Sequence, residues 1–192
     1  MHKILQKIGF VIRLRYGVNI SGYLRKYWFS IFGMQIGKNT NLPKMSITWP
    51  HQVSIGSDCN LEKNIIFKFD GIWKTGPSII IGNKAFIGSS CEFNITKGIV
   101  IGNYANIAAG CHFIDHDHGK SLKYLIGKQA LDERSIKIGN DVWLGCNVII
   151  LKGVVINDGA IVGAGAVVTK SILANEIWAG IPAKKIGERN LL

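Results

Sequence analysis

Residues 138–168 decide the fold, and they read IGNDVWLGCNVIILKGVVINDGAIVGAGAVV. An aliphatic side chain returns at every sixth position of this stretch, and a small or β-branched side chain follows it four places later. The aliphatic positions are Ile138, Leu144, Ile150, Ile156, Val162 and Val168. A period of six fits neither an α-helix, which repeats every 3.6 residues, nor a simple hairpin meander. It predicts short strands joined by regular corners and stacked as a parallel β-helix.

The same six-residue frame continues toward the N-terminus. Its aliphatic or aromatic positions there are Ile36, Ile55, Leu61, Ile81, Ile87, Phe93, Ile101, Ile107 and Phe113. Three hexads make one coil of about 18 residues, and Ile138 and Ile156 are 18 residues apart. We therefore expect an all-β chain in which residues 36–174 form a three-sided prism. The aliphatic side chains should fill its interior.

Two interruptions of the repeat predict loops that leave the prism. The spacing between coil starts rises to 26 residues before Ile81, which places about eight extra residues around 69–78. It rises to 37 residues before Ile138, which predicts a larger insertion at 114–137. The densest polar cluster of the chain, DHDH at 115–118, lies in this insertion. Because a long loop on a rigid repeat is typical of a functional segment, we expect the protruding loop to carry the active site.

The two ends depart from the repeat. Residues 1–35 mix Leu, Ile, Tyr, Trp and Phe with Arg and Lys, and they predict amphipathic helix with a break near 17–22. This segment either caps the open end of the prism, as solenoid ends require, or contacts an anionic membrane through residues 2–34. Residues 175–192 should close the other end.

Charge and cysteine usage limit the partners and the compartment. The 192 residues carry a net charge of +11, and no acidic residue precedes Asp58. This balance favours an anionic partner, which is a nucleic acid, a phosphorylated ligand or an acidic membrane face. No basic motif interleaved with aromatic residues recurs, so we expect no nucleic acid. Four dispersed cysteines and the lack of a signal peptide favour the cytoplasm, including the inner face of the membrane.

Three stretches of the chain resemble hexapeptide-repeat acyltransferases, namely IGNDVWLG at 138–145, VGAGAVVTK at 162–170 and AGIPAK at 179–184. The branch most similar to the chain holds bacterial polysaccharide, maltose and galactoside acetyltransferases. The resemblance implies a left-handed β-helix, a homotrimer, and acetyl-CoA bound in the groove between neighbouring prisms. It also implies acetyl transfer to a sugar hydroxyl, in cell-surface polysaccharide or lipopolysaccharide biosynthesis.

The resemblance assigns the general base to His118, five residues after Phe113. An imidazole with a pKa near 6.5 can take the hydroxyl proton and return it to the departing thiol. Asp115 or Asp117 would orient the ring, and His116 is the rival base. The alternating histidines also permit a zinc site, although no metal is expected. The alternative functions are an N-acetyltransferase acting on an amino sugar and a zinc-dependent hydratase on the same prism.

The remaining site residues also follow from the resemblance. It implies substrate contacts at Trp143, Asn94, Glu92 and His116, and cofactor contacts at Cys146, Ala164, Thr169, Lys170 and Lys184. Surface packing of Trp143 and ordinary surface polarity at Glu92 and Asn94 are the alternatives. Galactoside acetyltransferases carry arginines at the positions of Lys184 and Gly187, so the second contact is absent or is supplied by Lys185 or Arg189. Cys59, Cys91 and Cys111 occupy small inward positions and should be buried.

Overall fold

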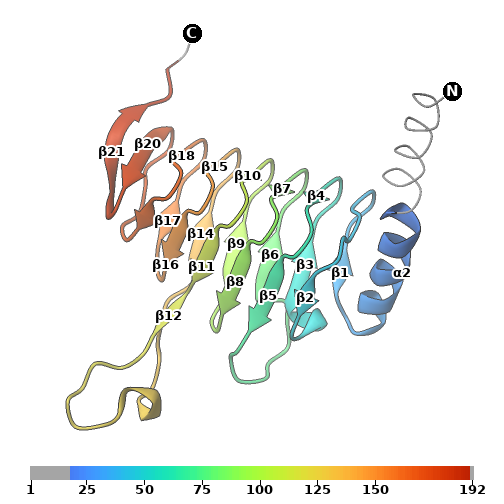
Figure 1. Cartoon of the computed structure of the whole chain (residues 1–192), viewed down its shortest axis with the longest axis horizontal. Helices are drawn as coiled ribbons and strands as arrows, with labels where there is room; N and C mark the ends of the chain where they lie inside the picture. Colours follow the sequence, from blue (N-terminus) through green and yellow to red (C-terminus); the bar gives the residue numbers. More distant parts are fainter. Residues whose placement is uncertain (1–17, 191–192) are drawn as a thin grey trace, which may run out of the picture.

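The computed structural model describes residues 18–190 and shows a three-sided parallel β-helix (Figure 1). Successive coils contribute short strands to three sheets. The first sheet holds β1 (Gln35–Ile36), β3 (Val53–Ile55), β6 (Ile79–Ile81), β9 (Ile99–Ile101), β14 (Ile136–Ile138) and β17 (Val155–Ile156). The second holds β4 (Asn60–Leu61), β7 (Phe86–Ile87), β10 (Asn106–Ile107), β15 (Trp143–Leu144), β18 (Ile161–Val162), β20 (Glu176–Gly180) and β21 (Ala183–Glu188). The third holds β2 (Ser46–Ile47), β5 (Ile66–Phe69), β8 (Glu92–Ile95), β11 (His112–Ile114), β16 (Ile149–Leu151) and β19 (Val167–Val168).

The strand register confirms the predicted repeat. The isoleucines that begin successive coils pair in register across the whole first sheet, in the order Ile36, Ile55, Ile81, Ile101, Ile138 and Ile156. Extra residues between these positions therefore leave the prism as loops and do not shift the register. Any slip by one residue would turn the inward side chains outward.

Inward side chains fill the prism along its length. The six aliphatic positions of residues 138–168 are all buried, as are Cys59, Cys91 and Cys111. On the third sheet Phe67, Phe93 and Phe113 stack with ring centroids 4.8 and 4.7 Å apart. These separations match the spacing of neighbouring strands, because each ring belongs to one coil.

Glycine and asparagine stack at one edge of the prism. The side-chain oxygen of Asn140 accepts a hydrogen bond from the Asn103 backbone N–H at 2.8 Å, and Asp158 accepts one from the Asn140 N–H at 2.7 Å. This ladder brings the corners close together. A Cβ atom on Gly102 would lie 2.6 Å from the carbonyl carbon of Gly139.

Both predicted loops leave the prism between the third and first sheets. The smaller one covers residues 70–78 between β5 and β6. The larger one covers 115–135, because Ile114 extends β11 and residues 136–137 belong to β14. It protrudes from the body as an antiparallel ribbon of β12 (His116–Asp117) and β13 (Asp132–Glu133), with the short helix η3 (Ile126–Lys128) near its tip (Figure 1).

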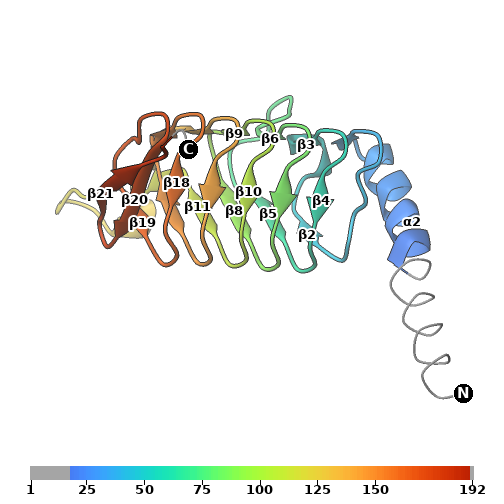
Figure 2. The same cartoon turned by 90° about the horizontal axis from the view of Figure 1, so that it is seen from above.

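The described part of the N-terminal segment is the helix α2 (Val18–Ile31), which lies against one end of the prism (Figures 1 and 2). The predicted break within 17–22 is wrong for residues 18–22, since the helix runs through Gly22 without interruption. Gly22 serves close packing, because a Cβ there would lie 1.7 Å from the Asn41 side-chain oxygen. The predicted helix over residues 1–17 lies outside the described residues. Strands β20 and β21 pair antiparallel at the other end.

The corner packing predicts unequal effects of two glycine substitutions. Gly102→Ala should lower the free energy of unfolding by about 1–3 kcal/mol, since its methyl group meets the backbone of the next coil. Gly127→Ala is the matched control, because nothing lies within 4 Å of the added atom, and it should change stability by less than about 0.5 kcal/mol. Urea denaturation of both variants measures the difference. Equal stabilities would contradict the proposed role of the corner glycines.

Candidate active site

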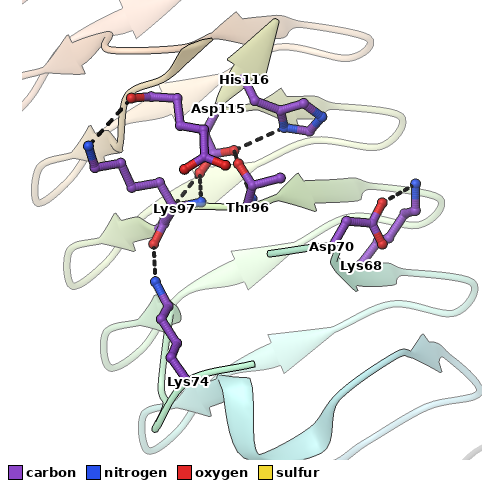
Figure 3. A network of polar contacts seen from close by, with 9 residues as sticks. Lys68, Asp70, Lys74, Thr96, Lys97, Asp115 and His116 are labelled. Carbon is purple, nitrogen blue, oxygen red and sulfur yellow. Dashed lines mark hydrogen bonds and ion pairs between the residues drawn. The ribbon is translucent and has the colours of Figure 1, made fainter. Parts of the chain in front are cut away.

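Asp115 fastens the root of the long loop to the prism. Its carboxylate is fully buried and accepts hydrogen bonds from the backbone N–H groups of Thr96, Lys97 and Gly98 at 2.8–2.9 Å. The Thr96 hydroxyl adds a fourth bond at 3.1 Å (Figure 3). A buried carboxylate with four donors is well satisfied, so the turn at 96–98 and the start of the loop form one rigid unit.

His116 is the histidine that a carboxylate orients. Its Nδ1 lies 3.1 Å from Asp115 Oδ1, and its side chain is 13% exposed (Figure 3). A proton on Nδ1 donated to the carboxylate leaves Nε2 as the acceptor nitrogen of the neutral ring. The arrangement gives His116 the geometry of a supported base or of a substrate hydrogen-bond partner.

His118 lies two residues further along and is exposed. Within residues 18–190 its ring has no hydrogen-bond or ion-pair partner, so the expectation that Asp115 or Asp117 orients it is not met in this structure. The physical reason is that both carboxylates are already engaged. Asp115 bonds the 96–98 turn and His116, whereas Asp117 pairs with Lys152 at 2.9 Å.

Lys152 joins the two strands of the loop ribbon. Its ammonium group pairs with Asp117 of β12 and makes a short contact with Asp132 of β13. Arg134 and Lys152 lower the pKa of Asp132 to about 2, and Lys152 also lowers the pKa of Asp117. Both carboxylates are therefore charged at neutral pH, and the pairs hold the ribbon beside the prism.

Polar side chains continue from the loop onto the outer face of the third sheet. Glu92 on β8 lies beside His112 on β11, with Oε2 and Nδ1 3.5 Å apart. Asn94 lies two residues further along β8, and its side-chain oxygen is buried without a hydrogen-bond partner among the described residues. Leaving a buried acceptor unpaired costs free energy, so a hydroxyl donor from a ligand would be stabilised there.

A second group of predicted site residues lines a different edge of the prism. Cys146 and Ala164 occupy equivalent corners of successive coils between the second and third sheets, and the Gly165 N–H donates to the Cys146 carbonyl at 2.8 Å. Cys146 is exposed at this corner. Trp143 is half exposed on β15 of the second sheet, immediately before the corner. His116 and His118 leave the prism at the edge between the third and first sheets. Within a single chain, the two groups of predicted site residues therefore lie at different edges of the prism.

The remaining predicted cofactor residues meet in a pocket of about 300 Å³ at the C-terminal end. Its lining comprises Thr169, Lys170, Trp178, Pro182, Ala183, Lys184 and Lys185. Glu176 organises this pocket, because it accepts from the Trp178 indole N–H at 2.9 Å and pairs with Lys185 at 2.9 Å. Lys185 lowers the pKa of Glu176. Trp178 and Glu176 escaped the sequence analysis because they lie where the six-residue frame fades.

The cations in and near this pocket differ in whether a carboxylate pairs with them. Lys185 also pairs with Glu188, and Arg189 pairs with Asp141 at 2.9 Å. Lys170 and Lys184 have no carboxylate partner among residues 18–190. They are therefore the cations in this pocket with charge available to an anionic ligand. Over the same residues, no group of three or more His, Cys, Asp or Glu side chains is arranged to hold a metal ion.

Two segments match known families of repeats. Residues 135–170 match the family described as bacterial transferase hexapeptide (six repeats), and residues 78–112 match the hexapeptide repeat of succinyl-transferase. Both segments of the chain therefore carry the hexapeptide repeat of bacterial transferases. The matched segments of this hexapeptide-repeat protein include Trp143, Cys146 and Ala164 but leave out residues 113–134, which hold nearly all of the loop.

Relatives of this hexapeptide-repeat protein are named as acetyltransferases. A putative acetyltransferase of Staphylococcus haemolyticus is 47% identical over 115 residues, which cover 60% of this chain and 59% of the relative. The galactoside O-acetyltransferase of Escherichia coli is 28% identical over 141 residues, which cover 73% of this chain and 59% of that enzyme. The chain thus spans less than two thirds of the length of either relative.

The fold also matches solved acyltransferases. The N-acyltransferase AntD from Bacillus cereus, solved with dTDP and 3-hydroxybutyryl-CoA, superposes with a TM-score of 0.73 at 22% identity. The match covers 86% of this chain and 88% of AntD. At this identity the similarity concerns the fold, in which three parallel sheets form the prism.

The Lys152 ion pairs predict a loop that loosens without them. Lys152→Met should raise backbone hydrogen exchange across 116–133, because Asp117 and Asp132 lose their shared cation. Lys128→Met, an exposed lysine on η3 of the same loop, is the control and should leave exchange unchanged.

Acid should also raise backbone hydrogen exchange in the wild-type loop, as the Lys152→Met substitution does. The depressed pKa values mean that the pairs hold above the usual aspartate value of 3.8 and are lost as the pH falls toward about 2. In Lys152→Met the pairs with Lys152 are already lost, so hydrogen exchange in its loop should rise less on acidification than in wild type. Identical exchange in Lys152→Met and wild type at neutral pH would show that the pairs do not order the ribbon.

Proposed function

We propose that the protein is an acetyl-CoA-dependent O-acetyltransferase that acts on a sugar hydroxyl. The observation that carries the proposal is the pair His116 and His118 at the root of a loop that Asp115 fixes to an acetyltransferase-family prism. Two further features support it. Asn94 offers an unpaired acceptor on β8, opposite Ile114 where the loop begins, and two lysines without a carboxylate partner line a pocket at the C-terminal end.

We assign the general base to His118, and we place His116 as a partner of the acceptor. An unprotonated ring nitrogen of His118 takes the hydroxyl proton as the sugar oxygen attacks the thioester carbon. The tetrahedral intermediate then collapses, the C–S bond breaks, and the same proton goes to the departing thiolate. His118 is free of other partners among the described residues, so its ring can reach a substrate, while the Nδ1 of His116 is held by Asp115.

The acceptor is a sugar that presents several hydroxyl groups. The buried oxygen of Asn94 would accept a bond from one of them, and Glu92 would accept from a neighbouring one. Trp143 would form an apolar wall beside the acyl group. We place the reaction in cell-surface polysaccharide or lipopolysaccharide biosynthesis, on the cytoplasmic side of the membrane.

The division of the site between two edges supports a homotrimer. His116 and His118 leave one edge, whereas Trp143, Cys146 and Ala164 line another. A neighbouring copy would bring its Cys146 edge against the histidine edge of this chain, with the pantetheine arm of acetyl-CoA between them. Thr169, Lys170 and Lys184 would then contact the CoA phosphates as hydrogen-bond donors and cations.

The assignment of the base predicts different losses for the two histidines. His118→Ala should lower kcat for acceptor-dependent thiol release by about 10²–10⁴-fold, since the general base is removed. His116→Ala should mainly raise KM for the acceptor. Thiol release from acetyl-CoA is measured over sugars, nucleotide sugars and amino sugars.

Three outcomes of that panel would revise the assignment. A collapse of kcat in His116→Ala with little loss in His118→Ala would transfer the base to His116. Turnover confined to amino sugars would identify an N-acetyltransferase, which the fold of AntD also accommodates. The absence of both turnover and acetyl-CoA binding would overturn the proposed reaction.

The two unpaired lysines predict a cofactor phenotype. Lys170→Ala and Lys184→Ala should each raise KM for acetyl-CoA by about 5–10-fold with little change in kcat, because each removes a charge-assisted phosphate contact. Lys63→Ala, an exposed lysine elsewhere on the prism, is the control. Steady-state kinetics with acetyl-CoA and with its dephospho analogue measure the effect. Unchanged KM in both variants would place the CoA phosphates elsewhere.

A further inference from the structure

Helix α2 presents a continuous apolar stripe to solvent. Tyr23, Leu24, Tyr27, Trp28 and Ile31 are each 58–71% exposed. At 100° per residue these five side chains fall within one arc of the helix. Five large apolar side chains gathered on one exposed helix face mark an interaction surface.

The opposite face of α2 is already used. Phe29 packs against the prism core, and the buried Gly22 lies against Asn41. Arg25 Nε donates to the Leu42 carbonyl at 3.0 Å, and Lys26 Nζ donates to the Gly37 carbonyl at 2.6 Å. Capping the prism therefore accounts for this inner face only. The same contacts hold the apolar stripe outward in a fixed orientation.

The charge around the stripe has one sign. Residues 1–57 contain eight lysines and arginines and no acidic residue. Arg25 and Lys26 pair with carbonyl groups and keep their charge, and Lys38 and Lys44 are exposed nearby along the chain. A second copy docking through the same face would oppose like charges, because α2 itself contains Arg25 and Lys26 and no carboxylate. An anionic surface complements this face.

The stripe also contains a hollow suited to a lipid. An open hollow of about 470 Å³ is lined by Ser21, Leu24, Arg25, Tyr27 and Trp28. An acyl segment would contact Leu24 and Trp28 there, and a headgroup phosphate would meet the Arg25 guanidinium at the border. Trp and Tyr are the side chains that favour the membrane interface, since an apolar ring and a polar group lie at opposite ends.

We propose that α2 docks the protein on the surface of an anionic lipid bilayer, with the five-residue stripe among the headgroups. Within the described residues no helix is long and apolar enough to cross a membrane, which agrees with α2 lying in the interface. The helix lies at the opposite end of the prism from β20 and β21 (Figures 1 and 2). Docking through α2 therefore leaves the pocket around Lys170 and Lys184 open. The proposal does not depend on the reaction that the protein catalyses.

Vesicle flotation of the full-length protein tests the docking. Wild type should float with vesicles of equimolar phosphatidylcholine and phosphatidylglycerol, and it should remain behind with phosphatidylcholine alone. Leu24→Gln combined with Trp28→Gln should weaken binding at least about tenfold, because two large side chains lose their burial in the interface. Added salt should weaken wild-type binding further, since the attraction between opposite charges is screened.

Leu173→Gln is the matched control. Leu173 is 66% exposed and Leu24 is 68% exposed, so both substitutions remove a similar exposed side chain, but Leu173 follows β19 at the other end of the prism. The control should float like wild type, and thermal melts should show both variants folded. Failure of wild type to float with anionic vesicles would overturn the proposal. The proposal would also be overturned if the Leu24→Gln, Trp28→Gln variant floated as well as wild type. The same holds if that variant changed its oligomeric state while it still bound vesicles.

Discussion

The width of the prism interior is the constraint on which the rest of the structure depends. Each strand directs one or two side chains into the interior, and neighbouring coils lie one strand spacing apart, as the stacked rings of Phe67, Phe93 and Phe113 show. Every coil must therefore return to the same register. Additional chain can only leave at a corner, and the two loops at 70–78 and 115–135 both do so at one edge.

Asp115 fixes the start of the long loop to the rigid prism and so positions the histidines of the candidate site. A flexible insertion would place His116 and His118 poorly, and holding a catalytic group in a defined orientation is a large part of catalysis. The buried carboxylate takes three backbone N–H groups from the preceding coil and also bonds His116. Lys152, from the following coil, holds both strands of the ribbon. The loop is thus fixed from both sides along the prism axis.

The sequence predicted the prism well because its repeat is local, and the coil starts at Ile36 through Ile156 pair as expected. The sequence also located the loop and its histidines, but it did not predict the hydrogen bonds of Asp115 or the ion pairs of Lys152. The donors to Asp115 lie 17–19 residues away, and Lys152 lies 35 residues from Asp117, so only the folded chain brings them together. The break expected near Gly22 failed because that glycine serves packing and does not end the helix.

Both ends of the molecule carry cations that have no carboxylate partner among the described residues. In the C-terminal half, carboxylates neutralise Arg134, Lys152, Lys185 and Arg189, which hold structure together. Lys170 and Lys184 have no carboxylate partner among the described residues, and they line a pocket where an acyl-CoA phosphate would be stabilised. At the N-terminal end the first 57 residues contain no carboxylate, and no lysine or arginine of residues 18–57 has a carboxylate partner among the described residues. Because the described cations at both ends are not used in ion pairs, they support the two proposed anionic partners, a phosphorylated cofactor at one end and a lipid surface at the other.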